Sequence, residues 1–224
     1  MKTYIWSFPT RIFHALLVLF ILIAWLSADD DFLQIHSAFG YAITVLIVFR
    51  LLWGIIGPKY SRFKDFNFRM NEALEFARSI FSFNGSKKYL GHNPAASILM
   101  LIMIITLSII VLTGILDLGI QEEKGPFTFL YQTFLGDVEL FEELHEFFAN
   151  ILLLFIFMHL IGILSDKLLH PEDKTLQSMM TGYKHIKGQD IKLNLFQILI
   201  SFVFFVLTFL SIYFTFTQWT FLYS

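Results

Sequence analysis

Five long, uninterrupted apolar stretches constrain this chain more than any other feature of its sequence. They cover about residues 11–28, 35–56, 95–116, 145–165 and 195–217, and charged residues, Gly or Pro bound each of them. The hydrocarbon core of a bilayer is roughly 30 Å thick, and a helix needs about 20 apolar residues to cross it. The stretches therefore predict an all-α integral membrane protein with five transmembrane helices.

Composition agrees with a lipid environment and narrows the chemistry. Hydrophobic residues make up 56% of the chain, charged residues only 15%, and the mean hydropathy is +0.67. We expect membrane lipid to surround the chain, and we expect no nucleic-acid partner. Cysteine is absent, which excludes disulfides, cysteine-ligated iron–sulfur clusters, zinc–thiolate sites and covalently attached c-type haem. Any metal must depend on His, Met, carboxylate or a cofactor's own atoms.

The distribution of charge predicts the orientation in the membrane. If the first helix starts in the cytoplasm, fifteen of the 16 Lys and Arg lie inside and only Lys124 lies outside, together with eleven of the 18 acidic residues. The positive-inside rule then places the N-terminus in the cytoplasm and, after five crossings, the C-terminus outside. A cleaved signal ending at WLSA (25–28) is the alternative for the first stretch, but Leu26 stands where a small residue is needed.

Two segments outside the spans have their own character. A short helix is predicted near 69–83, with its apolar residues on one face; it either lies on the cytoplasmic membrane surface or packs on the bundle. The residues of that face are Met70, Leu74, Ala77, Ile80 and Phe81. The polar connection over 166–193 is predicted to be a cytoplasmic loop.

Four of the seven histidines fall inside or at the ends of predicted spans, where ionisable residues are costly. His145 and His159 are fourteen residues apart, so they share one helix face and lie about 21 Å apart along the axis. His36 and His145 should be level near the outer surface, and His14 should be level with His159 near the inner one. Two facing imidazole pairs in a helix bundle suit axial ligation of two flat iron porphyrins. Taken singly, each histidine would more simply be a hydrogen-bonded structural residue.

Arg50 lies fourteen residues after His36, hence on the same face and near the inner pair. An arginine there could pair with the carboxylates of an inner haem, or it could be an anchor that extends to the cytoplasm. Gly40, Gly54 and Gly162 could let a macrocycle approach the backbone, although ordinary helix packing explains each glycine as well.

Five sequence strings resemble the bacterial cytochrome b561 family and the related b-type cytochrome subunits of nickel–iron hydrogenases and formate dehydrogenases. They are WSFPTRIFH (6–14), IHSAFGY (35–41), FRLLWGIIGPKYSRF (49–63), YLGHNP (89–94) and ELHEFFANILLLFIFMHLIG (143–162). The resemblance implies a four-helix core over about residues 1–185 that holds two non-covalent b haems. It also implies His14, His36, His145 and His159 as iron ligands. Residues 186–224 would add a fifth transmembrane helix beyond that core.

These expectations lead to one principal function and two alternatives. We expect a cytochrome b of the bacterial inner membrane that carries electrons between the quinone pool and an outer redox partner. That partner would be a c-type cytochrome or a hydrogenase or dehydrogenase subunit. The alternatives are an enzyme that oxidises or reduces superoxide or quinone at a haem edge, and a haem-free membrane anchor subunit. Candidate quinone contacts near the inner haem are His92 and Arg11.

Overall fold

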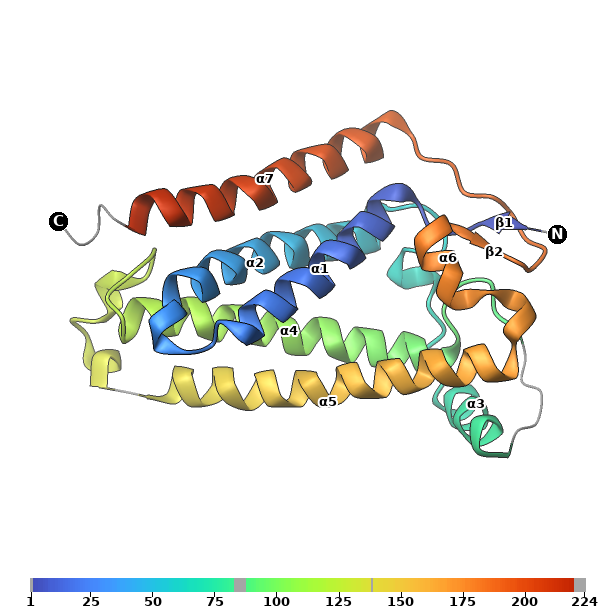
Figure 1. Ribbon diagram of the computed structural model, residues 1–224, viewed down its shortest axis with the longest axis horizontal. Helices are drawn as coiled ribbons and strands as arrows, with labels where there is room; N and C mark the ends of the chain where they lie inside the picture. Colours follow the sequence, from blue (N-terminus) through green and yellow to red (C-terminus); the bar gives the residue numbers. More distant parts are fainter. Residues whose placement is uncertain (1, 83–87, 138, 220–224) are drawn as a thin grey trace. The chain divides into compact units, whose positions relative to one another are not determined.

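The computed structural model describes residues 2–82, 88–137 and 139–219, and it is an all-α integral membrane protein (Figure 1). All five predicted spans are confirmed as helices long and apolar enough to cross a membrane. They are α1 (Phe8–Leu26), α2 (Leu33–Ile56), α4 (Pro94–Ile120), α5 (Leu140–Leu169) and α7 (Leu195–Trp219). Shorter elements are α3 (Met70–Ser82), α6 (Thr175–Thr181), strands β1 (Thr3–Tyr4) and β2 (Tyr183–Lys184), and 3₁₀ turns at Asp30–Phe32, Phe63–Asp65, Thr128–Leu130, Phe134–Asp137 and Pro171–Asp173.

Side-chain caps begin two of the long helices. The Asn93 side chain accepts a hydrogen bond from the Ala96 amide at 2.8 Å, directly before Pro94 opens α4. At α7, Asn194 accepts from the Gln197 amide at 2.8 Å, while the Gln197 side chain accepts from the Asn194 amide at 3.0 Å. This reciprocal capping box satisfies amides that a helix start leaves without an intrahelical partner.

The chain divides into two compact units that each contain part of every long helix. The first unit comprises residues 1–14, 50–103 and 153–199, and the second comprises 15–49, 104–152 and 200–224. Charge follows the same division. Of the 16 Lys and Arg, only Lys124 belongs to the second unit, which also holds eleven of the 18 acidic residues.

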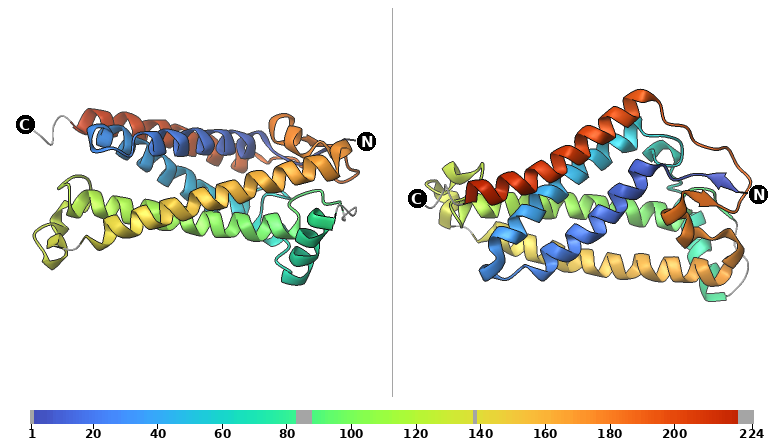
Figure 2. Two further views of the ribbon diagram at one scale, coloured as in Figure 1. Left: turned by 60° about the horizontal axis from the view of Figure 1, so that its bottom comes forward. Right: turned by 45° about the horizontal axis from the view of Figure 1, so that its top comes forward.

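Two short strands tie the chain's beginning to the polar segment that follows α5. Strands β1 and β2 pair antiparallel, with Thr3 opposite Lys184 and Tyr4 opposite Tyr183. Helix α6 lies beside this pair in each view (Figures 1 and 2). The Trp6 indole donates to the Ser178 hydroxyl of α6 at 3.1 Å. The segment 166–193, predicted only as a cytoplasmic loop, therefore contains α6 and β2 and is paired with the N-terminus. Its cytoplasmic location stays a prediction.

The helix predicted near 69–83 is present as α3. Ala73 and Phe76 are buried, whereas Met70 and Leu74 are exposed. The helix therefore packs on the protein through one side, as one of the two expected arrangements requires, and keeps apolar residues exposed on another. Its contact with the membrane surface stays a prediction. Residue 83, at the end of the predicted segment, and the side chains of Ile80 and Phe81 lie outside the described part of the chain.

Candidate functional site

Within the second unit, α2 and α5 bring His36 and His145 together. Their ring centres are 5.8 Å apart, and the ring planes meet at 73°. A metal ion held between two imidazole nitrogens at about 2 Å each would separate the ring centres by roughly 6 Å. The spacing of this pair therefore suits two ligands on opposite sides of one ion.

Each ring of this pair is oriented by a backbone carbonyl. His36 Nδ1 lies 2.9 Å from the Ala24 carbonyl oxygen, and His145 Nδ1 lies 2.9 Å from that of Ile110. Because a carbonyl only accepts, both Nδ1 atoms must donate, which leaves each neutral ring with its lone pair on Nε2. Metal-binding histidines are held by this kind of outer hydrogen bond. Ala24 lies in the last turn of α1, where carbonyls lack intrahelical partners.

Gly114 in α4 is the residue that sequence reasoning missed. A Cβ atom at Gly114 would lie 2.7 Å from Cε1 and 2.8 Å from Nδ1 of His145. The absence of a side chain is thus what lets the ring reach the Ile110 carbonyl, one turn earlier. Nothing in the sequence marked this glycine, because the contact joins two helices. Gly40, one turn after His36, faces open space instead.

His14 and His159 both belong to the first unit, which also contains a third histidine, His92. Burial, followed by the positive charges of Arg50 and Lys184 and then by His159 and His14, lowers the pKa of His92 to about 3. His92 is therefore neutral at neutral pH. His14, His159 and Arg50 all lie within electrostatic range of the His92 ring.

Arg50 is buried, with 7% of its surface exposed. Its guanidinium donates to the Ser61 carbonyl at 3.2 Å and lies over the rings of Phe63 and Phe66 at 4.8 and 5.7 Å. Within the described residues it forms no ion pair with a carboxylate. The expectation that Arg50 extends to the cytoplasm as an anchor is wrong. A buried, uncompensated cation favours an anionic ligand beside it.

The buried side-chain polar atoms of this unit that have no hydrogen-bond partner include His92 Nδ1 and Arg11 Nε. The His92 ring lies between Trp6 and Phe66, at centroid distances of 4.8 and 5.0 Å. Arg11 also donates through its guanidinium to the Met180 carbonyl. Buried polar groups are normally satisfied, so these two atoms indicate hydrogen-bonding capacity for a bound group.

The remaining glycines differ from one another. A Cβ at Gly54 would lie 2.1 Å from the Phe63 ring, so the space beside this glycine is filled by Phe63. The expectation that Gly54 admits a macrocycle is therefore wrong. Gly162 on α5, three residues after His159, faces open space.

The donor set fits a flat iron macrocycle that carries carboxylates. In the described part of the chain, no three His, Asp or Glu residues gather to hold a metal ion. Two imidazoles could hold the iron of such a group while the macrocycle's own nitrogens would supply its other ligands, and carboxylates of the macrocycle would neutralise the charge of the buried Arg50.

A family model described as prokaryotic cytochrome b561 matches residues 5–182. The match contains all four span histidines, Arg50, Arg11 and His92, and it ends before α7. No curated protein and no solved structure matches the chain.

Proposed function

The chain belongs to the prokaryotic cytochrome b561 family, and on that premise we propose that it binds two haems, one at each histidine pair. Membership makes it a membrane cytochrome of the b type that functions in electron transfer and binds haem b. The haem-free anchor alternative therefore has no support. The number of haems, their ligands and the redox partners are what we propose here.

The hydrogen-bonded pair of His36 and His145 carries the proposal. Each ring donates through Nδ1 to a backbone carbonyl, which leaves Nε2 available to a metal, and the ring centres are 5.8 Å apart. His14 and His159 would hold the second haem, beside Arg50. Arg50 would neutralise one of its carboxylates, and Arg11 and His92 would supply hydrogen bonds to it or to a nearby quinone.

Bound haem b supplies a one-electron iron couple, and its axial ligands, burial and neighbouring charge set its potential. The chain's residues then have distinct tasks. Ala24 and Ile110 fix the tautomer and orientation of the outer ligands through their carbonyls. The buried Arg50 would hold positive charge near the second haem, which would favour the reduced, more negative state of a group bound there.

The segregation of charge between the two units supports the proposed orientation, with the second unit at the outer surface. We propose that residues 1–185 form the dihaem core and that 186–224 add the fifth helix. Electrons would pass between the quinone pool and an outer partner. Eleven acidic residues against one lysine would attract a basic partner, such as a c-type cytochrome.

The ligands are tested by counting haems in the purified protein. Wild type should carry two haems per chain by pyridine haemochrome assay, with low-spin bands that dithionite reduces. His159→Ala should lose one haem and keep the signal of the other, because His36 and His145 are untouched.

His185→Ala is the matched control, since His185 lies beyond α6 in the polar connecting segment and should leave both haems in place. One haem per wild-type chain, or two haems in His159→Ala, would contradict the proposed pairing. Reduction of the bound haems by added quinol tests the exchange with the quinone pool separately.

A further inference from the structure

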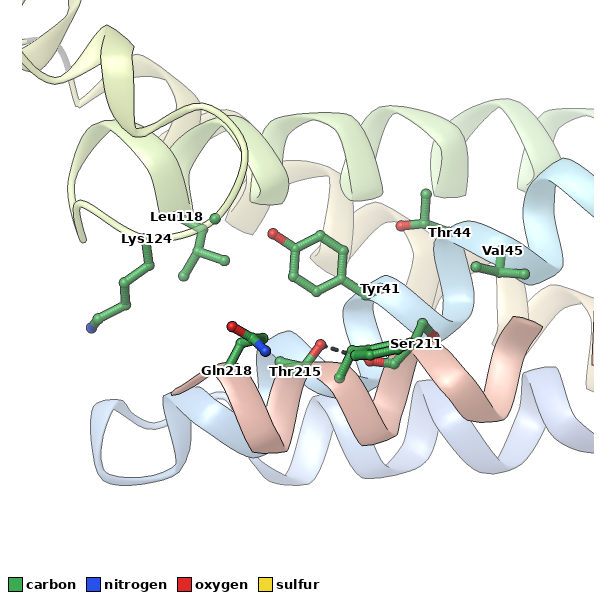
Figure 3. A pocket seen from close by; sticks show the side chains of 10 residues that line it. Tyr41, Thr44, Val45, Leu118, Lys124, Ser211, Thr215 and Gln218 are labelled. Atoms are coloured by element: carbon green, nitrogen blue, oxygen red, sulfur yellow. Dashed lines mark hydrogen bonds between the residues drawn. The ribbon is translucent and has the colours of Figure 1, made fainter. Parts of the chain in front are cut away.

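The second unit contains a cavity of about 360 Å³ between α2, the end of α4 with its following loop, and α7 (Figure 3). This volume lies within the range of small-molecule sites. Helix α7 lies outside the segment that the family model matches. The matched segment therefore supplies only part of the lining of this cavity, and α7 supplies the rest.

The cavity has few hydrogen-bond donors to offer. Tyr41 Oη is buried and has no hydrogen-bond partner. By contrast, the hydroxyls of Thr44, Ser211 and Thr215 each donate at 2.8 to 2.9 Å to a carbonyl of their own helix. The phenol of Tyr41 and the amide of Gln218 therefore stand out as the donors for a ligand. They suit an uncharged acceptor such as an ester carbonyl.

A charged pair lies at the same cavity. Lys124 is one of its lining residues, and its ammonium forms an ion pair with Glu122 at 2.8 Å. The Lys124 side chain is 13% exposed and that of Glu122 is 41% exposed. Lys124 is also the only cation in the second unit. The electron-transfer proposal gives this lysine no task, although every other charge of its unit is negative.

We propose that this cavity binds the head and upper chains of a zwitterionic phospholipid. The phosphate would lie against the Lys124 ammonium, the lipid's own ammonium against the Glu122 carboxylate, and a glycerol ester carbonyl would accept from Tyr41. The apolar chains would run along α7 and α2, whose exposed side chains are already apolar. This role is independent of haem binding and gives α7 a function as a lipid-holding helix.

Charge selects this ligand over two others. An anionic lipid without an ammonium group would leave Glu122 opposed to its net negative charge. A quinone would use the Tyr41 donor but would have no group for Lys124. In addition, Tyr41 follows His36 by only five residues on α2. A quinone in this cavity would therefore exchange electrons with the haem at His36 and His145, which is also the haem proposed to react with the outer partner.

The test is native mass spectrometry of the haem-loaded protein in mild detergent, titrated with dioleoyl phosphatidylethanolamine. Wild type should bind one lipid in preference to phosphatidylglycerol and to diacylglycerol. Lys124→Gln should weaken binding about tenfold and Tyr41→Phe about fivefold, as expected for a charged and a neutral hydrogen bond. Lys64→Gln, the same change at an exposed lysine of the first unit, should have no effect.

Three results would overturn the proposal. If diacylglycerol bound as tightly as phosphatidylethanolamine, the phosphate would make no contact that contributes to binding. A short-chain quinone that binds equally to wild type and Lys124→Gln, and displaces the lipid, would assign the cavity to an uncharged carrier. Unchanged lipid binding in both variants would place the lipid elsewhere. Haem content, read from the same spectra, reports separately on the electron-transfer proposal.

Discussion

At the scale of single residues, Gly114 controls whether His145 can present its Nε2. We predict that Gly114→Ala displaces the His145 ring, because the new methyl group would lie 2.7 Å from Cε1. Overpacking of this kind costs about 1–3 kcal/mol. At limiting haem this should lower occupancy of the His36–His145 pair roughly tenfold, measured as haem per chain and by low-temperature spectra that resolve the two low-spin signals.

Gly91→Ala is the control for this change. A Cβ at Gly91 would lie 3.5 Å from the nearest atom, in the Tyr60 ring, which is ordinary contact. It should retain both haem signals. Full occupancy in Gly114→Ala would show that the Ile110 hydrogen bond does not position the ring.

At the scale of elements, the N-terminus and α6 depend on each other through Trp6. We predict that Trp6→Phe destabilises the first unit by about 1–2 kcal/mol, because it leaves the buried Ser178 hydroxyl without the indole donor and reduces the contact with His92. Thermal unfolding in detergent measures the loss. Trp25→Phe, at a side chain that is 56% exposed on α1, should change stability by less than about 0.5 kcal/mol. Equal effects of the two changes would contradict the proposed coupling.

The elements differ in how far the sequence could predict them. The spans were predictable because crossing a membrane requires length and apolarity within one segment. The approach of His36 to His145 followed from helix periodicity and orientation. Strand β2 and helix α6 were not predictable in this way, because β1 pairs with residues about 180 positions later and short polar segments have no strong periodicity. The Gly114 contact and the covering of Gly54 by Phe63 also depend on tertiary packing alone.

At the scale of the whole molecule, the charge difference between the units predicts that the acidic second unit faces the outside. Because the chain has no cysteine, single introduced cysteines can test this orientation. We predict that Glu123→Cys, at an exposed position beside the lone Lys124, reacts with a membrane-impermeant maleimide in intact cells whose outer membrane, where present, has been opened. Lys64→Cys, also at an exposed position but in the basic first unit, should react only after the cytoplasmic membrane is permeabilised. The wild-type chain has no thiol and serves as the blank. Labelling of Lys64→Cys but not of Glu123→Cys in intact cells would reverse the orientation, and with it the assignment of His36 and His145 to the haem nearest an outer partner.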